Sequence, residues 1–502
     1  MREGMSATEV KSRASSGAVL LMGRGAAFQV LGFLGNLALA RLLVPEDFGI
    51  VAIGLTMLNL GRTLAGTGLG SALVARSEPP ARDELRALAG LQLLITSGIT
   101  AIACAAALYI GGDAPVTAFM VLALPLMALR MPALLLFRRR LEFVPQIKVE
   151  IAETLVYLAV SIALAAAGWG AWSLAIATVV RALVGTIAAI SLSPLGIVWP
   201  SRQFHRLRSI LGFGWRFQAT GWSQLGFEMG LTACIGAIAG LGVLGLWSFA
   251  SRLLGIPRIL FESMWSVGFP AFSRLMDSDE DNDIGGLLER TVGTFAVAAS
   301  AILCPLVAAS PALVPLLFGA EWTDVSLILP GAALALMISG PIGLVASAYF
   351  YAKGDAGTGL KMSIITDLVR IAVTLALLSR FGAAAIGLGW FVGSLAGMAF
   401  TVPRARRASG ARLGRRMLGP CVSATLAGAV GWLVADELGV TVASAAVATL
   451  SATGLWLASM WIFSRETLSQ GFRMCRTILA SAFSGVRARR RRHPVPAPSS
   501  SV

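Results

Sequence analysis

Eight arginines lie inside stretches that are otherwise apolar enough to cross a lipid bilayer. They are Arg24, Arg62, Arg130, Arg181, Arg216, Arg252, Arg258 and Arg370. A charged side chain at bilayer depth costs at least ~2.5 kcal/mol, so each arginine needs an acidic partner, a wet cavity or a route to the surface. Only four acidic residues lie at comparable depth, namely Glu153, Glu228, Glu262 and Asp367. Eight positive charges against four negative ones predict a cavity that takes an anionic substrate.

The composition places this chain in a membrane. Of its 502 residues, 56% are hydrophobic and 13% are charged, and the mean hydropathy is +0.77. Soluble domains carry about 25% charged residues. The five cysteines are scattered singly and the two histidines lie in polar basic segments, so no metal-ligand spacing and no disulfide framework stands out. We therefore expect an integral membrane protein that uses no metal and no cofactor.

Apolar runs long enough to cross ~30 Å of hydrocarbon recur along the whole chain. They predict an all-α polytopic protein with about fourteen transmembrane helices. The predicted spans are 18–42, 48–75, 87–110, 115–137, 149–168, 170–193, 209–239, 241–270, 291–318, 324–352, 362–381, 383–402, 417–435 and 440–463. Inside the fourth of them, Pro125 and Pro132 indicate a bending point.

The basic residues between the spans predict the orientation. If the N-terminus is cytoplasmic, the inside segments hold 31 Lys and Arg, whereas the outside turns hold only two, Arg41 and Arg380. This asymmetry follows the positive-inside rule and places both termini in the cytoplasm. It also accounts for the net charge of +15 without nucleic acid as a partner.

Two segments resemble each other at a spacing of 196 residues. Phe48-Gly49-Ile50-Val51 and Leu244-Gly245-Leu246-Trp247 each follow a short outside turn, and Arg62 and Arg258 then fall at the same place in the two helices. The repeat predicts two lobes of six helices, which in transporters meet at the substrate site. The predicted parts are a cytoplasmic segment 1–17, an N-lobe 18–193, a linker 194–208, a C-lobe 209–402, two further spans in 417–463, and a cytoplasmic tail 464–502. The tail is an amphipathic helix followed by a basic disordered end, both suited to anionic lipid.

Four stretches carry a resemblance to a known family. Residues 40–49 read Ala-Arg-Leu-Leu-Val-Pro-Glu-Asp-Phe-Gly and residues 67–74 read Thr-Gly-Leu-Gly-Ser-Ala-Leu-Val. Residues 267–275 read Val-Gly-Phe-Pro-Ala-Phe-Ser-Arg-Leu before an acidic stretch, and residues 318–322 read Phe-Gly-Ala-Glu-Trp. In this order they resemble Wzx-type polysaccharide flippases, the lipopolysaccharide and exopolysaccharide biosynthesis proteins of the multidrug/oligosaccharidyl-lipid/polysaccharide exporter superfamily.

The resemblance implies a V-shaped two-lobe bundle in the bacterial inner membrane. Such a protein is not an enzyme: it carries a polyprenyl-diphosphate-linked oligosaccharide repeat unit from the inner to the outer leaflet. Its partners would be that glycan substrate, membrane lipids, and the polymerase and glycosyltransferases of the same pathway. The count of fourteen helices is closer to the lipid II flippase branch than to the commonest count of twelve.

Arginine suits a diphosphate because its planar guanidinium binds phosphate oxygens through two hydrogen bonds and stays protonated. We assign the diphosphate site to Arg24, Arg62 and Arg258, followed by Arg216 and Arg252. Four amide side chains within the spans can bind sugar hydroxyls, although such residues also link helices to each other. They are Gln29, Asn36, Asn59 and Gln224.

Several arginines have an alternative structural explanation. Glu228 and Glu262 are possible charge partners, and Glu262 lies one helical turn after Arg258. Asp367 and Arg370, three residues apart, can pair along their own helix. Arg181 has Glu153 as a partner on the neighbouring helix. Arg130 lies near the end of its span, where its side chain can reach the cytoplasmic headgroups.

Two other functions compete with glycolipid transport. A cation-coupled efflux pump of the same superfamily takes mostly cationic drugs and needs acidic helices, so the excess of arginine disfavours it. An intramembrane polymerase or glycosyltransferase usually carries a large polar loop with paired carboxylates or histidine, whereas the outside turns of this chain are short. The chain also lacks a Gly-x-x-x-x-Gly-Lys-Ser/Thr motif, so ATP is not expected to drive it directly.

Overall fold

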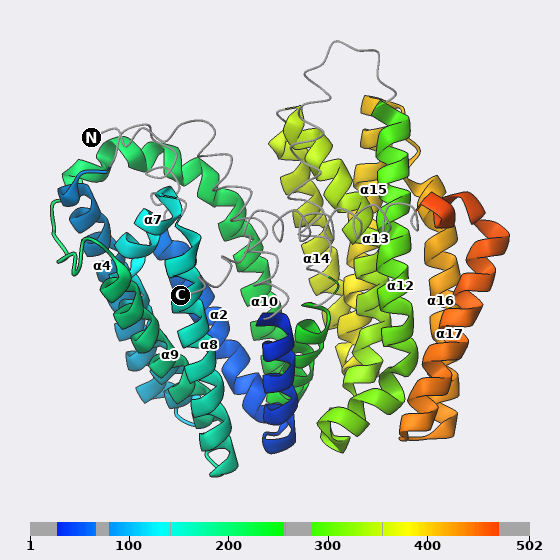
Figure 1. Cartoon of the computed structure of the whole chain (residues 1–502), viewed down its shortest axis with the longest axis horizontal. Helices are drawn as coiled ribbons and strands as arrows, with labels where there is room; N and C mark the ends of the chain where they lie inside the picture. The colour runs from blue at the N-terminus through cyan, green and yellow to red at the C-terminus, as the bar shows by residue number, and fades with distance from the viewer. Residues whose placement is uncertain are drawn as a thin grey trace, which may run out of the picture. The chain divides into compact units, whose positions relative to one another are not determined.

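The computed structural model describes residues 28–66, 80–140, 142–255, 257, 284–353 and 355–470, and these ranges contain helices but no strand (Figure 1). The first helix within the described residues is Phe28–Leu42. The labelled helices are α2 (Pro45–Gly66), α4 (Arg82–Ile110), α5 (Ala114–Val121), α6 (Ala123–Leu129), α7 (Met131–Arg139), α8 (Phe143–Ala166), α9 (Ala171–Leu192), η1 (Phe204–Leu207), α10 (Arg208–Leu253), α12 (Ile284–Phe318), η2 (Ala320–Trp322), α13 (Val325–Ala352), α14 (Ala356–Phe381), α15 (Ala384–Ser409), α16 (Leu413–Leu438) and α17 (Val442–Phe463).

The helices confirm the predicted all-α, multi-pass membrane fold. Within the described residues, eleven helices are long and apolar enough to span a membrane, or twelve if the bent pair Ala114–Leu129 and Met131–Arg139 is one span. Each of the fourteen predicted ranges overlaps a helix, and α10 contains two of them, joined at Gly240, whose φ is 84°. The count of fourteen spans and the orientation of the termini stay predictions.

The helix starts follow ordinary capping chemistry. Helix α2 begins with proline at its first position and has Glu46 and Asp47 in its first turn, where the helix dipole favours negative charge. Helix α4 likewise begins with Asp83 and Glu84, and the Glu84 carboxylate accepts a hydrogen bond from the Ala81 amide at 2.9 Å. These local signals and the apolar composition together fix where the helices start.

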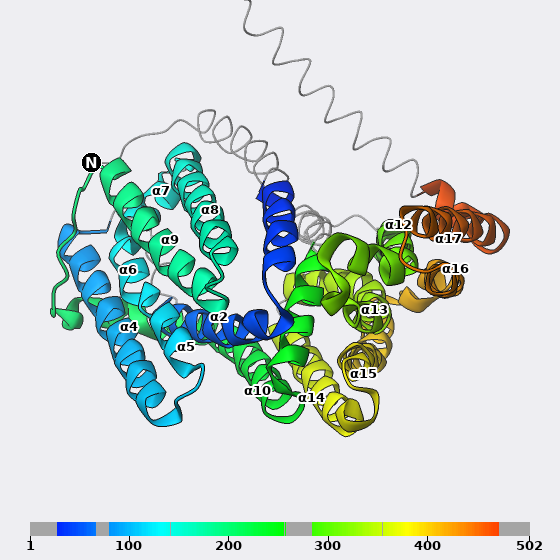
Figure 2. The same cartoon turned by 90° about the horizontal axis from the view of Figure 1, so that it is seen from below.

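The described residues group into two compact units. Unit 1 comprises Met1–Leu253, Val314–Ile328 and Ile371–Ile386, and unit 2 comprises Leu254–Leu313, Leu329–Arg370 and Gly387–Val502. In unit 1, α2 packs against α10 and α8 packs against α9 (Figures 1 and 2). Helices α4, α5 and α6 also contact one another in this unit.

Helix α2 and the second part of α10 cross at two glycines. A Cβ atom on Gly49 would collide with the carbonyl oxygen of Leu241, and a Cβ atom on Gly245 would collide with the carbonyl oxygen of Pro45. The contact is therefore reciprocal, because each glycine meets the residue four positions before the other. Both pairs of equivalent residues are separated by 196 positions, which is the spacing of the predicted repeat.

An aromatic cluster in unit 1 joins two of the motif segments. The rings of Phe48, Phe249, Phe318 and Trp322 lie with neighbouring centroids 4.4 to 5.8 Å apart, and all four side chains are buried. The Trp322 Nε1–H donates a hydrogen bond of 2.9 Å to the carbonyl oxygen of Ala40. Residues 40–49 and 318–322, far apart in the sequence, thus form one packed structure.

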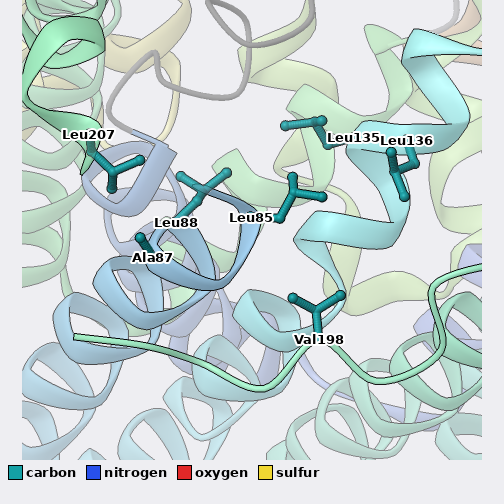
Figure 3. Close-up of a cluster of buried hydrophobic side chains, with 7 residues drawn as sticks. All are labelled: Leu85, Ala87, Leu88, Leu135, Leu136, Val198 and Leu207. Atoms are coloured by element: carbon teal, nitrogen blue, oxygen red, sulfur yellow. The ribbon is translucent and has the colours of Figure 1, made fainter. Parts of the chain in front are cut away.

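An apolar cluster fixes α4 and α7 to the connection before α10. It consists of Leu85, Ala87, Leu88, Leu135, Leu136, Val198 and Leu207 (Figure 3). Each of these side chains is at most 9% exposed. The cluster holds the start of α4 beside α7, and both helices carry residues of the cavity described below.

In unit 2, α16 and α17 lie side by side (Figures 1 and 2). An apolar cavity of about 380 Å³ is lined by residues of α12, α13 and α16. Asp355 precedes α14, and its carboxylate accepts hydrogen bonds from the Thr358 hydroxyl at 2.6 Å and the Thr358 amide at 3.1 Å. These hydrogen bonds, the one from the hydroxyl foremost, hold the pKa of Asp355 below its usual value.

Candidate functional site

Unit 1 contains a polar cavity of about 530 Å³ between α2, α4, α6, α7 and α10. It is lined by Asn59, Arg62, Thr63, Ala65, Gly66, Gln92, Thr96, Leu124, Met127, Ala128, Arg130, Met131, Leu134, Arg138, Leu225 and Glu228. Its volume is in the range of pockets that bind small ligands, ~300–1,000 Å³.

The charge of this cavity is predominantly positive. Arg62 comes from α2, Arg130 from the junction of α6 and α7, and Arg138 from α7, whereas Glu228 on α10 is the only carboxylate among the described lining residues. Arg62 also lies within electrostatic range of Arg181. The arrangement favours an anionic ligand with several oxygens.

A break in the fourth predicted span places Arg130 in the cavity. The segments Ala114–Leu129 and Met131–Arg139 meet at an angle of 48°, with Pro132 in the first turn of α7. The break frees the carbonyl of Leu126, because the Arg130 amide bonds to Ala128 instead. The hydroxyl of Thr186 on α9 lies 2.8 Å from this freed carbonyl and 2.7 Å from the carbonyl of Ala182 in its own helix, so its proton can be donated to either. The predicted bend is thus present, and α9 compensates for it.

A buried carboxylate fixes the same arginine. Glu153 on α8 is 4% exposed and forms an ion pair with Arg130, and its other oxygen lies 3.7 Å from Nε of Arg181. A Cβ atom on Gly185 would collide with both charged groups of the Arg130–Glu153 pair, so glycine leaves the space that they occupy. The predicted contact of Glu153 with Arg181 is confirmed. The prediction that Arg130 reaches the headgroups is wrong, because this buried carboxylate holds its guanidinium.

The side of the cavity that α4 forms is polar but uncharged. Gln92 and Thr96 are each 2% exposed, and the Thr96 hydroxyl donates to the main-chain carbonyl of Gln92 at 2.8 Å. The side-chain Oε1 of Gln92 has no hydrogen-bond partner among the described residues. Gln92 is not among the predicted site residues, although a glutamine inside an apolar span is a signal that points to it.

The structure brings three predicted site residues together, namely Arg62, Asn59 and Glu228, all of which line the cavity. Arg24, Arg258 and Glu262 lie outside the described residues, as do the side chains of Arg216 and Gln224 on α10. Gln29 and Asn36 lie on the helix Phe28–Leu42. Of the five arginines assigned to the diphosphate site, the structure describes the side chains of Arg62 and Arg252, and only Arg62 of these two lines the cavity.

Other predicted residues lie away from the cavity. Arg252 donates a hydrogen bond of 2.9 Å to Oδ1 of Asn36 and lies over the ring of Phe48, 5.1 Å from its centroid. In unit 2, Asp367 accepts a hydrogen bond from Ser363 at 3.2 Å, and Arg370 lies 5.0 Å from the ring centroid of Trp390. Across the described ranges, no three His, Cys, Asp or Glu side chains come together as a metal site requires.

Comparison with solved structures defines the class of fold. The lipid II flippase MurJ, in an inward closed conformation, superposes with a TM-score of 0.68 over 90% of this chain and 100% of its own, at 13% identity. A multidrug resistance MATE family transporter of the MOP superfamily, in an inward-facing conformation, gives a TM-score of 0.51 at 16% identity, covering 76% of this chain and 96% of the transporter. The chain thus has the multi-pass helical fold of these two membrane proteins.

Sequence comparison gives the family. Residues 38–327 match the polysaccharide biosynthesis protein family, and this chain belongs to it. The match confirms the resemblance carried by residues 40–49 and 318–322 and includes every described residue of the cavity. The succinoglycan biosynthesis transport protein ExoT of Rhizobium meliloti (strain 1021) is 26% identical over 303 residues, which are 57% of this chain and 58% of that relative.

Proposed function

We propose that this chain is a flippase that moves a polyprenyl-diphosphate-linked oligosaccharide across the bacterial inner membrane, with both termini in the cytoplasm. The observation that carries the proposal is the cavity in unit 1, where three arginines and one carboxylate share about 530 Å³. The family and the name of the ExoT relative support a role in polysaccharide transport.

The arginines would bind the diphosphate. A charged diphosphate loses hydration on entering the membrane, and guanidinium groups replace the lost water with charge-assisted hydrogen bonds. Arg62 and Arg138 are exposed to the cavity, whereas Arg130 is held by Glu153. Arg62 and Arg138 are therefore the groups available for the substrate, because the charge of Arg130 is compensated by Glu153.

This charge pattern disfavours the competing functions. A pump for cationic drugs would place its substrate beside Arg62 and Arg138, whose charges no described ion pair compensates. A polymerase or glycosyltransferase needs paired carboxylates or histidine, and Glu228 is the only such side chain among the described residues of the cavity. We infer that the chain is a transporter and not an enzyme.

The test is export of the polysaccharide by cells that carry variants of Arg62 and Arg138. Arg62→Ala combined with Arg138→Ala should abolish export while the protein still inserts in the membrane. The corresponding lysine variants should restore it only in part, because lysine keeps the charge but loses the planar donor pair. Arg82→Ala is the matched control, since Arg82 is an exposed arginine of α4 outside the cavity. Full export by the double alanine variant would rule out the proposed diphosphate site.

A further inference from the structure

The strongest remaining feature of the cavity is Gln92. Its side chain is 2% exposed, it lines the cavity from α4, and its Oε1 atom has no hydrogen-bond partner among the described residues. It lies roughly 15 Å along α4 from the start of the helix, within the predicted span 87–110, and lipid around such a span offers no hydrogen bonds. A buried amide oxygen without a partner destabilises a protein, so its presence in a cavity points to a ligand that supplies a donor.

A structural role does not account for this amide. Helix α4 is held in place by the apolar cluster around Leu85 and Leu88 (Figure 3), and the contacts of Thr96 and Thr100 run to main-chain carbonyls. The Thr100 hydroxyl lies within 3.2 Å of the carbonyl of Val121 and so links α4 to α5. Gln92 Oε1 makes no comparable link to a neighbouring helix in the described part of the chain.

The two walls of the cavity define the chemistry of the ligand. Arg62 and Arg138 offer only donors and positive charge, whereas Oε1 of Gln92 offers an acceptor. The Thr96 hydroxyl, one helical turn further along, donates its proton to the main-chain carbonyl of Gln92 and keeps its oxygen free to accept. The ligand must therefore carry an anionic group on one side and hydroxyl donors on the other. A sugar attached directly to a diphosphate has both.

We propose that Gln92 is a specificity-determining residue that accepts a hydrogen bond from a hydroxyl of the sugar attached to the diphosphate. The cavity volume of about 530 Å³ suits a diphosphate with its proximal sugar and not a whole oligosaccharide. Recognition at this position would read the sugar next to the diphosphate and not the sugars beyond it. The inference rests on the proposed function.

Binding to purified full-length protein in lipid nanodiscs tests the proposal with three probes: undecaprenyl diphosphate, and the same lipid linked to glucose or to galactose. Wild-type protein should bind at least one sugar-linked probe about tenfold more tightly than the bare diphosphate, which corresponds to about 1.4 kcal/mol. Gln92→Met, which keeps the volume but removes the amide, should lose this preference and keep the affinity for the bare diphosphate. Gln92→Asn, whose amide is withdrawn by one methylene group, should lose part of the preference and provides a second variant if Gln92→Met fails to fold.

Two controls separate the possible causes. Thr100→Val removes a buried polar group of α4 that does not line the cavity, and should leave the preference unchanged. Arg62→Ala should weaken binding of all three probes. A Gln92→Met variant that keeps the preference, or that weakens all probes equally, would overturn the role of Gln92, as would a wild-type protein that does not discriminate. A wild-type protein that binds none of the probes would contradict the proposed function itself.

Discussion

Removing the charge of Glu153 should destabilise unit 1 more than removing Arg130. The side chains of the pair are 14% and 6% exposed for Arg130 and Glu153, respectively, so this is a buried ion pair. Leaving one partner of such a pair costs about 3–5 kcal/mol, whereas removing both can be nearly neutral. Glu153→Gln preserves the volume beside Gly185 but leaves two arginines without their carboxylate.

The two single variants should differ in stability, because Arg181 is a second partner of Glu153. In Arg130→Met, Glu153 keeps Arg181 at 3.7 Å, and the Arg181 side chain is 43% exposed, so that pair contributes only about 0–1 kcal/mol. We expect Glu153→Gln to lower the free energy of unfolding by about 3–5 kcal/mol and Arg130→Met to lower it by less. The double variant should be less stable than wild type by only ~1 kcal/mol.

The free energies of unfolding can be measured by steric trapping in detergent micelles, for the wild type, both single variants and the double variant. The double-mutant cycle should give an interaction energy of at least about 2 kcal/mol between Arg130 and Glu153. Additive effects of the two substitutions, or a Glu153→Gln variant as stable as the wild type, would refute the assignment of Glu153 as the fixed counter-charge of this arginine.

Three further predictions follow from single positions. Gly185→Ala should lower the melting temperature, because the added Cβ meets the Arg130–Glu153 pair. Gly98→Ala on α4, where the added Cβ faces open space, should leave the melting temperature unchanged or raise it. Equal effects of the two substitutions would contradict the packing around Gly185. The pKa of Asp355 lies below the ordinary 3.8, so its stabilisation of α14 is complete above pH 3.8 and is lost as the pH falls through the folded pKa. The difference in melting temperature between wild type and Asp355→Ala should therefore shrink in acid. A difference that stays constant would refute the stabilising role of the hydrogen bonds from Thr358 to Asp355. Cysteine at Ser409 should react with impermeant thiol reagents only after the inner membrane is opened, and cysteine at Glu46 in intact spheroplasts; the opposite pattern would reverse the orientation.

The helices were readable from the sequence because their causes are local. Apolar length, proline at a first helical position and acidic first turns all act within a few residues, and each predicted span overlaps a helix. The bend in the fourth span was indicated by Pro132, for the same local reason. Arg62 was predicted to bind the diphosphate, and Asn59 to bind a sugar hydroxyl or to link helices. Both line the cavity, and these roles stay predictions.

The contacts of Arg130 and Gln92 were not readable, because they depend on which helices become neighbours. Arg130 meets Glu153 only because α8 and the broken span both pack against α9, at the space left by Gly185. A sequence shows the residues but not this neighbourhood, so Arg130 was assigned to the membrane surface. Gln92 was overlooked since an amide in an apolar helix is ordinary until its lack of a partner is visible.

The reciprocal contact of Gly49 and Gly245 determines which mutations can suppress one another. Each glycine faces a main-chain carbonyl, of Leu241 or of Pro45, and substituting those residues leaves the carbonyl in place. A side chain at either glycine therefore has no suppressor at positions 45 or 241, unlike a change in Arg130, which a change in Glu153 can offset. Selection for revertants of Gly49→Ala should return glycine itself, or insertions and deletions that shift one helix along the other. Because the contact is made by the backbone, substitution of a neighbouring side chain cannot relieve a change at either glycine.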